Sequence, residues 1–511
     1  MASRHKLSKS TYTYGRQCLK RLYLHKNHTR LGVAKDKQSA SLQSRFLLGT
    51  EVGTLAQAYF PGGLDCTPAN TLDFGPSLAL TSAAIDQGSH SVIYEACFQA
   101  EDVLVALDIL VRREDGWHGY EVKSTKSVEP QHVTDAALQY WVIQRSGLPL
   151  LSMNIMHLSG HFVRDSEPID VNKLFSTIDI TEKVLEEQAV IAENVERQMS
   201  CLDIEDTVPD VRIGKHCTTP YPCDFMKHCW KQANVPEYSV LNLSRGGAKS
   251  WRLYYEGVEH IKDIGDGTPL SPTQKLQVEC DKSGRAHIDV VSLAEFVAGV
   301  TYPIHYLDFE TIAPPVPLFA NSRCYQAITF QYSLHTQYSP FSDSFFSDDP
   351  ALLHTDFIGD GTAADPRQPL LARLLEDIGD TGCVMVYNKS FEDARLKEMS
   401  VDFPEFAERI DHIRSRLVDL AIPFQKKHYY TPSMKGKYSI KQVLPAVCPQ
   451  YLNSYTDLDI QEGMAASNTY MSMIGSEDTT TKETELKNLL EYCKLDTLAM
   501  VKIYEVICRL V

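Results

Sequence analysis

The amino-acid sequence predicts an α/β protein in which two α/β modules are joined by a connector. Two patterns lead to this prediction. A strand-rich stretch at about 92–123 lies between helical segments, and an apolar run at 302–309 opens a second α/β region. The 511 residues suggest about three domains. With 43% hydrophobic and 23% charged residues, the chain can bury a sizeable core, which excludes wholesale disorder.

Three regions follow one another along the chain. Residues 1–235 combine a basic helical start, the strand-rich stretch and helices to about 200, and end in a proline-rich loop. Residues 236–298 predict short helical turns and polar loops, which we interpret as a helical connector. Residues 299–511 begin with the predicted central strand at 302–309 and end with a predicted helix over 482–511.

The charge is unevenly distributed. The net charge is −16, yet residues 1–60 hold eleven lysines and arginines against two acids, which leaves −25 on the rest of the chain. In this basic arm the lysines and arginines are interleaved with Tyr12, Tyr14 and Tyr23. Residues 1–10 lack the apolar stretch of a signal peptide, and no run of 18 apolar residues occurs, so we expect a cytoplasmic protein without a membrane partner.

The first candidate site lies in the segment VLVALDILVRREDGWHGYEVKS. A turn at Asp115-Gly116 predicts a β-hairpin, with Asp108 on its first strand. Glu121 and Lys123 are two residues apart on the second strand, so their side chains leave the same face. Converging carboxylates can bind Mg²⁺, and a lysine beside them can hold or deprotonate an attacking water. The alternative is an ordinary solvated hairpin.

This segment resembles the RecB-like branch of the PD-(D/E)XK nucleases. Asp108 matches the family's metal-binding aspartate, and Glu121 with Lys123 matches its E-x-K motif. Glu95 matches an acid that often precedes the aspartate, and Gln139 matches the glutamine of a following helix. The resemblance implies a restriction-endonuclease-like fold over residues 1–235, with a divalent cation held by Asp108 and Glu121.

Two positions depart from the RecB-like pattern. Four residues after Gln139 the family carries tyrosine, whereas this chain has Ile143. The family's early Gly-x-x-x-His motif is best matched by Gly49 to Gly53, with glycine in place of the histidine ligand. The cation of this site would therefore lack one protein contact.

The cysteines suggest a second cofactor. Cys217, Cys223 and Cys229 are evenly spaced, and Cys18 lies far upstream. Four thiolates suit a 4Fe–4S cluster or a structural zinc. The Cys-x-x-Cys turns that zinc sites favour are absent, so we favour iron–sulfur and keep zinc, or unrelated thiols, as alternatives. The arrangement resembles the iron–sulfur nucleases of CRISPR systems and of AddAB, which implies that the cluster staples the two ends of the module together.

The second candidate site is spread over the C-terminal region. Asp308 and Glu310 are two apart at the end of the predicted central strand, on one face. Glu392 follows Asn388 where a strand runs into a helix. Tyr492 and Asp496 are four apart on the last helix, hence on one side of it. Such acids can hold two Mg²⁺ or Mn²⁺ ions for phosphoryl chemistry, while the tyrosine orients the attacking water.

This set resembles the DnaQ-like exonucleases of the RNase H-like fold. Asp308 with Glu310 matches the first motif, D-x-E, and Tyr492 with Asp496 matches the last, Tyr-x-x-x-Asp. Asn388-x-x-Phe391-Glu392 matches the second motif except that Glu392 replaces the usual aspartate. The resemblance implies 3′–5′ exonuclease chemistry over residues 299–511. Taken whole, the chain resembles an uncharacterised bacterial family that fuses the two nuclease modules.

A basic loop supplies a candidate nucleic-acid surface. Lysines neutralise phosphates and tyrosines stack on unpaired bases, which favours single-stranded DNA or RNA as partner. A solubilising surface loop is the alternative. The loop lysines are Lys426, Lys427, Lys435, Lys437 and Lys441.

The sequence thus predicts a metal-dependent phosphodiester hydrolase. We expect the C-terminal site to hydrolyse single strands and the N-terminal module to cut or bind DNA, in a DNA repair or antiviral defence complex with protein partners. The alternatives are a non-catalytic nucleic-acid-binding scaffold with degenerate sites, and a cluster that serves as a redox sensor.

Overall fold

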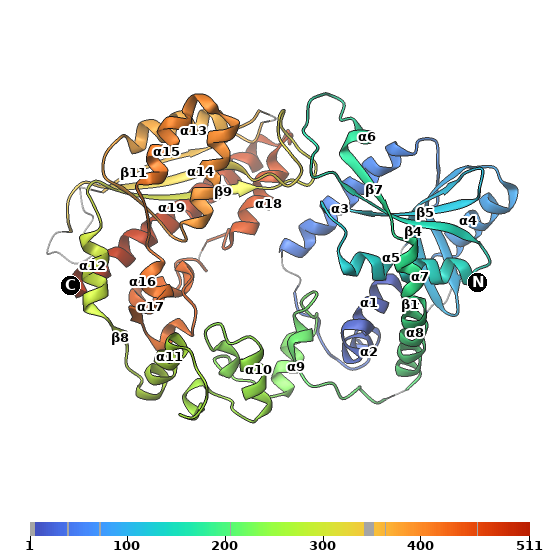
Figure 1. Ribbon diagram of the computed structural model, residues 1–511, viewed down its shortest axis with the longest axis horizontal. Helices are drawn as coiled ribbons and strands as arrows, with labels where there is room; N and C mark the ends of the chain where they lie inside the picture. Colours follow the sequence, from blue (N-terminus) through green and yellow to red (C-terminus); the bar gives the residue numbers. More distant parts are fainter. Residues whose placement is uncertain are drawn as a thin grey trace. The chain divides into compact units, whose positions relative to one another are not determined.

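The computed structural model describes residues 6–37, 40–70, 73–204, 206–341, 352–362, 364–456 and 458–511, with only the backbone for 40–48. The chain divides into two compact units, and both are α/β, as the sequence predicts (Figure 1). Unit 1 comprises Met1–Asn234 and Pro314–Gln326, and unit 2 comprises Val235–Ala313 and Ala327–Val511. The expected connector, 236–298, therefore belongs to unit 2.

Within the described residues, unit 1 is built on a seven-stranded mixed sheet. Its order is β2-β3-β4-β5-β6-β7, and β1 pairs in parallel with β4. The predicted hairpin is confirmed, because β4 and β5 are antiparallel. Gly116 has a φ of 143° in the connecting turn, a conformation that favours glycine. The strands are β1 (Leu7–Ser8), β2 (Leu64–Asp65), β3 (Val92–Ala100), β4 (Val103–Arg112), β5 (Trp117–Lys123), β6 (Leu150–Leu158) and β7 (Phe175–Asp179).

Helices cover both faces of this sheet. One core cluster joins the sheet to α5, α7 and α8, with Trp141 and Ile191 among its buried residues. Another joins the opposite face to α3 and α6. The helices of unit 1 are α1 (Lys9–Gln17), α2 (Leu19–Asn27), α3 (Ala40–Tyr59), α4 (Gly75–Gln87), α5 (Pro130–Arg145), α6 (Val171–Leu174), α7 (Thr181–Glu186), α8 (Gln188–Asp203), η1 (Lys215–Cys217) and α9 (Met226–Gln232).

The segment 314–326 joins unit 1 although its neighbours in sequence belong to unit 2. Its residues Val316 and Cys324 are buried in the same core cluster as α3. The backbone N–H of Arg164 donates to the Ser322 carbonyl at 3.0 Å, and the Arg164 guanidinium donates to the Pro317 carbonyl at 2.6 Å. Unit 1 is therefore completed by a piece of chain that the sequence pattern places in the other module.

Unit 2 contains a five-stranded sheet of order β11-β10-β9-β12-β13 in its described residues. β10 is antiparallel to β9 and β11, whereas β12 is parallel to β9 and β13. β9 is the middle strand, which confirms the predicted central strand. The strands are β8 (His287–Ile288), β9 (Ile304–Ile312), β10 (Ile328–Gln337), β11 (Leu352–Ile358), β12 (Cys383–Val386), β13 (Leu417–Asp419) and β14 (Tyr429–Tyr430), of which β8 and β14 form a separate ribbon.

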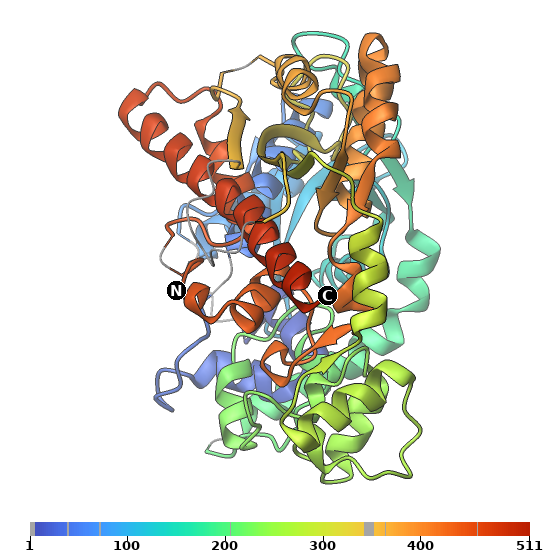
Figure 2. The same ribbon diagram turned by 90° about the vertical axis from the view of Figure 1, so that its left-hand side faces the viewer.

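Helices α13, α14 and α15 pack on one face of this sheet, and α19 packs on the other (Figure 1). The predicted C-terminal helix is confirmed as α19, the long red helix of Figure 2. Asp478 caps it by accepting from the backbone N–H of Thr481 at 3.1 Å. The helices here are α13 (Arg367–Ile378), α14 (Ser390–Asp402), η4 (Pro404–Phe406), α15 (Ala407–Ser415), α16 (Ile422–Gln425), η5 (Pro432–Met434), α17 (Ile440–Val447), η6 (Pro449–Tyr451), α18 (Gly463–Met473) and α19 (Thr479–Leu510).

The segment before β9 forms short helices, as predicted. It has a small core of its own, which includes Val240, Leu253 and Val278. The elements are η2 (Val240–Asn242), α10 (Ala248–Tyr255), η3 (Ile261–Asp263), α11 (Pro272–Ser283) and α12 (Val290–Ala298). Among all helices of the described ranges, none combines the length and the apolar character needed to cross a membrane.

Candidate functional site

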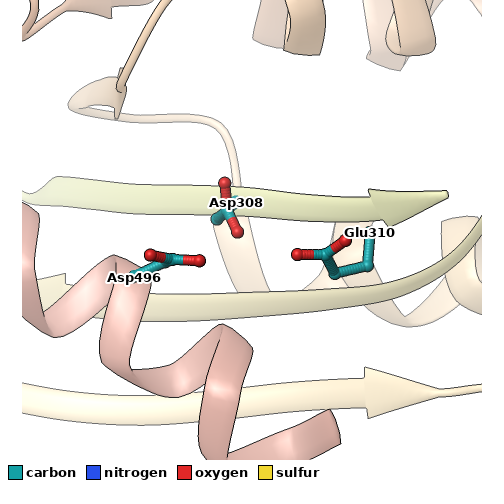
Figure 3. Close-up of side chains that lie close together, drawn as sticks. All are labelled: Asp308, Glu310 and Asp496. Atoms are coloured by element: carbon teal, nitrogen blue, oxygen red, sulfur yellow. The ribbon is translucent and has the colours of Figure 1, made fainter. Parts of the chain in front are cut away.

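Three carboxylates of unit 2 converge on one point (Figure 3). Leu307 and Phe309 of β9 point into the core beneath α13, α14 and α15. The alternation of a strand therefore turns Asp308 and Glu310 to the opposite face, on which α19 lies. Asp496 of α19 meets them there, and one oxygen of each of the three carboxylates lies within 4.8 Å of the others. In the described residues, no other group of three carboxylate, thiol or imidazole ligands comes this close.

The three carboxylates are buried and repel one another. Burial raises the pKa of Asp308 well above its usual range, and neighbouring Asp496 raises it further. Burial, followed by Asp308 and Asp496, does the same to the pKa of Glu310. Burial also raises the pKa of Asp496, although hydrogen bonds from Tyr455 and Tyr492 and the charge of Lys441 oppose the shift. A divalent cation would relieve this repulsion, because hard cations bind carboxylate oxygens.

A lysine and two tyrosines surround Asp496. The hydroxyl of Tyr455 donates to the Asp496 carboxylate at 2.6 Å. The Lys441 ammonium donates to the Tyr492 hydroxyl at 3.0 Å, and it lies 4.8 and 5.0 Å from the ring centroids of Tyr492 and Tyr455. Lys441 was expected in the nucleic-acid-binding loop, but the structure places it in α17 beside the acidic group. Sequence reasoning did not single out Tyr455, since no motif surrounds it.

Glu392 lies next to the three carboxylates rather than among them. It is 2% exposed on α14, and its Oε2 atom has no hydrogen-bond partner among the described residues. Burial and the charge of Asp308 raise the pKa of Glu392 well above its usual range. An unsatisfied buried carboxylate oxygen is costly in free energy, so Glu392 suits a fourth cation ligand. Asn388 precedes α14 at a φ of 75°, and its backbone N–H donates to the Asp419 carboxylate at 3.0 Å.

One further side chain contacts the acidic group from α19. The thiol of Cys493 donates to the Asp308 carboxylate at 3.5 Å. No motif singles out this cysteine, because its contact with Asp308 depends on how α19 packs against β9.

In unit 1 the E-x-K residues come together around Glu121. The backbone N–H of Val122 donates to the Asp108 carboxylate at 2.6 Å, so the two strands bring Asp108 beside Glu121 as expected. Lys123 contacts Glu121 at 3.0 Å and Asp135 at 2.8 Å. The Gln139 amide donates to the Glu121 carboxylate at 2.7 Å. Both carboxylate oxygens of Glu121, the central residue of this site, therefore contact other side chains.

Lysines dominate the electrostatics of the unit 1 site. Burial acts to raise the pKa of Glu121, but Lys9 and Lys123 outweigh burial and hold this pKa well below its usual range. Burial and the Glu121 charge raise the pKa of Asp108 to about 8. Burial likewise raises the pKa of Glu95, which has a φ of 50° and lies on β3, the strand that pairs with β4. Lys9 was not expected here.

The position of the missing histidine contributes no ligand. Gly53 lies in α3, and a Cβ atom at this position would meet no atom within 4 Å. A larger side chain would fit at this position, but glycine has no side chain that could bind a cation.

The four predicted cluster cysteines line one pocket of unit 1. Cys18 lies between α1 and α2, Cys217 in η1, Cys223 in the following loop and Cys229 in α9. Burial raises the pKa of the Cys223 thiol to about 12 and also raises the pKa of the Cys217 and Cys229 thiols, which favours their protonated form in the absence of a bound cation.

The spacing of the thiols bears on which metal they fit. Four sulfurs around one zinc at 2.3 Å would lie about 3.8 Å apart. Among the described residues, no three of these sulfurs lie within 4.8 Å of one another. The four thiols therefore do not already stand in the arrangement of a tetrahedral zinc site.

The basic loop has a mixed environment. Lys426 and Lys437 are exposed. Lys435 forms an ion pair with Glu237. Lys427 is buried with its ammonium 3.8 Å from the Tyr430 ring centroid, and burial lowers its pKa to about 8, so a phosphate cannot reach it in this conformation. In the basic arm, Arg4 and the Arg45 side chain lie outside the described residues.

Comparison with known proteins identifies relatives of unassigned function. The family described as "Domain of unknown function (DUF2779)" matches residues 305–439, a segment that includes Asp308, Glu310 and Glu392 but ends before Asp496. An uncharacterised protein of Mycoplasma pneumoniae is 29% identical over 213 residues, which cover 39% of this chain and 31% of the relative. One of Mycoplasma genitalium is 26% identical over 211 residues, with the same coverage.

A third relative, an uncharacterised protein of Ureaplasma parvum, is 37% identical over 81 residues, which cover 15% of this chain and 12% of the relative. The chain thus spans less than a third of the length of the curated relatives that it matches.

Proposed function

We propose that the protein is a metal-dependent phosphodiester hydrolase whose active centre is the acidic group of unit 2. The observation that carries this proposal is the convergence of Asp308, Glu310 and Asp496 within 4.8 Å, with raised pKa values. Apart from Lys441, no charge-compensating group is recorded at these acids among the described residues. Buried acids in this state favour uptake of a divalent cation, Mg²⁺ or Mn²⁺.

The side chains around the acids have distinct roles in this proposal. Asp308, Glu310 and Asp496 would hold the cations, and Glu392 would offer its unsatisfied oxygen as a further ligand. Bound cations would stabilise charge on the scissile phosphate and lower the pKa of the attacking water. Tyr492, fixed by Lys441, would orient that water, while Tyr455 keeps the Asp496 carboxylate in place.

The direction of attack and the substrate follow from the resemblance to DnaQ-like exonucleases. We infer 3′–5′ hydrolysis of single-stranded DNA or RNA by an RNase H-like module. A mixed sheet with two acids on its middle strand and the last acid on a helix across one face supports this inference. The exposed Lys426 and Lys437 would bind phosphates of the strand.

For unit 1 we propose a RecB-like, restriction-endonuclease-like module that carries an iron–sulfur cluster and binds nucleic acid. The four cysteines that line one pocket support the cluster. Service in a DNA repair or antiviral defence complex, with protein partners, is part of this proposal. The second candidate function is a non-catalytic scaffold, which the lysine-bound Glu121 and the vacant ligand position at Gly53 favour for unit 1.

Hydrolysis assays separate these functions. We expect 5′-labelled single-stranded DNA or RNA to be shortened to a ladder with Mg²⁺ or Mn²⁺ and to stay intact with EDTA. Asp308→Ala should abolish the ladder, and Lys123→Ala should leave it, because Lys123 belongs to unit 1. Tight binding without cleavage under either metal would instead identify a scaffold. A ladder lost only with Lys123→Ala would move the activity to unit 1.

Lys441 should support turnover while it weakens the binding of the metal. Without its ammonium, Tyr492 loses its donor and the acids lose a competing cation. We therefore expect Lys441→Ala to lower kcat about a hundredfold while it lowers the Mg²⁺ concentration needed for half-maximal activity. Lys441→Arg should bring both kcat and the Mg²⁺ requirement part of the way back to the wild-type values. Lys437 is at an exposed loop position, so Lys437→Ala should change KM alone. If Lys441→Ala changed only KM, Lys441 would be a residue that binds substrate phosphate, and this prediction would be wrong.

A further inference from the structure

The carboxylate at the centre of the unit 1 site is already bound by cationic and amide groups on both oxygens. Its Oε1 atom lies 2.7 Å from the Lys9 ammonium and 3.0 Å from the Lys123 ammonium. Its Oε2 atom accepts from the Gln139 amide at 2.7 Å. Glu121 is only 1% exposed, and these three side chains supply the polar contacts to its carboxylate. A cation bound at Glu121 would have to displace one of them.

The backbone before Lys9 fixes the position of this lysine. β1 consists of the two residues directly before Lys9, and it pairs with β4, the strand that carries Asp108. Ser8 caps α1, and its side chain accepts from the Thr11 backbone N–H. At the other end of α1, the Gln17 amide donates to the carbonyls of His216 and Tyr221 at 2.6 and 2.7 Å. Contacts at both ends of α1 thus hold the helix in place and position the Lys9 ammonium beside Glu121.

These residues do not fit the divalent cation that the RecB-like resemblance implies. The described carboxylates of unit 1 include no group of three with oxygens within 4.8 Å, in contrast to unit 2. A divalent cation beside Glu121 would lie within a few ångströms of two ammonium groups, and like charges this close repel strongly in a buried site. The two lysines instead form ion pairs with Glu121 and Asp135, which supply the positive charge that a metal would otherwise bring.

We propose that Lys9 takes the place of the metal in unit 1, so that this site binds no divalent cation while α1 is docked. Lys9 is then a residue that determines which of the two acidic sites uses metal. The proposal concerns binding, and it holds or fails whether or not unit 2 hydrolyses nucleic acid.

Manganese binding to the full-length protein tests this directly, with free Mn²⁺ measured by electron paramagnetic resonance. All variants carry Asp308→Asn to weaken the unit 2 site. In this background, Lys9→Met should create an additional Mn²⁺ site at least tenfold tighter than any site in the parent, and adding Asp108→Asn should remove it. Lys9→Arg should behave like the parent. Lys6→Met is the matched control, because Lys6 pairs with exposed Asp203 instead.

Two outcomes overturn the proposal. The first is a Mn²⁺ site in the parent that disappears with Asp108→Asn alone, which needs no Lys9 variant and so remains decisive if Lys9→Met fails to fold. The second is a folded Lys9→Met protein that gains no site. A gain with Lys6→Met equal to that with Lys9→Met would likewise count against it, because a general loss of positive charge would then explain the result.

Discussion

Replacement of Asp496 with asparagine should stabilise the metal-free protein and abolish hydrolysis at the same time. Asp496 is 7% exposed and faces two other carboxylates, so its charge is unfavourable in the fold without a cation. Because the substitution removes one of three repelling buried carboxylates, we expect a gain of about 1–3 kcal/mol in the free energy of unfolding, within the usual range for a single substitution. Loss of a cation ligand should lower kcat on the order of a thousandfold.

The gain should depend on pH in a defined direction. A carboxylate whose pKa is raised in the fold binds more protons folded than unfolded between its two pKa values. The stability of the metal-free wild type should therefore fall as pH rises from about 4 through the raised pKa values of Asp308, Glu310 and Asp496. The advantage of Asp496→Asn should be larger at pH 8 than at pH 5, as measured by denaturant unfolding in EDTA.

Magnesium should remove most or all of this stability advantage of Asp496→Asn. At a hundred times its dissociation constant, a ligand stabilises the folded protein by about 2.7 kcal/mol, and wild type should gain this while Asp496→Asn should not. Glu491→Gln is the control, because Glu491 is exposed on the same helix. A variant that loses stability in EDTA, or keeps its response to Mg²⁺, would show that Asp496 is a structural residue rather than a ligand.

Replacement of Cys223 with serine should remove the cluster from unit 1. Cys223 lines the same pocket as Cys18, Cys217 and Cys229, and serine is a poor ligand for iron. We expect wild type to be brown with broad visible absorption, and Cys223→Ser to lose most of its iron and colour. Because the four cysteines join the start and the end of unit 1, its melting temperature should fall by several degrees while unit 2 keeps its own.

A nearby cysteine provides the control for this experiment. Cys201 is buried beside Leu19 but does not line the pocket, so Cys201→Ser should keep the iron. A colourless wild type with one zinc per chain would assign the site to zinc, and one without any metal would leave the cysteines as unrelated thiols.

The sequence could predict local elements and the residues that they align. A period of two on the central strand placed Asp308 and Glu310 on one face, and a spacing of four placed Tyr492 above Asp496. The structure brings these acids together, since β9 is the middle strand and α19 crosses it. The position of Glu392 could not be predicted in this way. Its distance from the other three acids depends on how α14 packs against the sheet rather than on the motif around Glu392.

Long-range contacts could not be predicted in this way. Lys9 lies 112 residues from Glu121 in sequence, and composition showed only that it belongs to a basic arm. Lys441 belongs to a lysine-rich loop by composition, yet it lies in the first turn of α17, from which its side chain reaches Tyr492. A charged residue has the same appearance in sequence whether it meets solvent or a buried carboxylate, since only the packing of distant elements decides between them.

The membership of 314–326 in unit 1 means that the chain passes from one unit to the other three times, at 234/235, 313/314 and 326/327. A single proteolytic cut after residue 234 would leave Val316 and Cys324, both buried in unit 1, attached to the other fragment. Residues 1–234 expressed alone would lack the 314–326 segment of unit 1. Residues 235–511 expressed alone would contain unit 2 together with this segment of unit 1. The two units are thus inseparable by truncation, and each is best studied in the intact chain by point substitution.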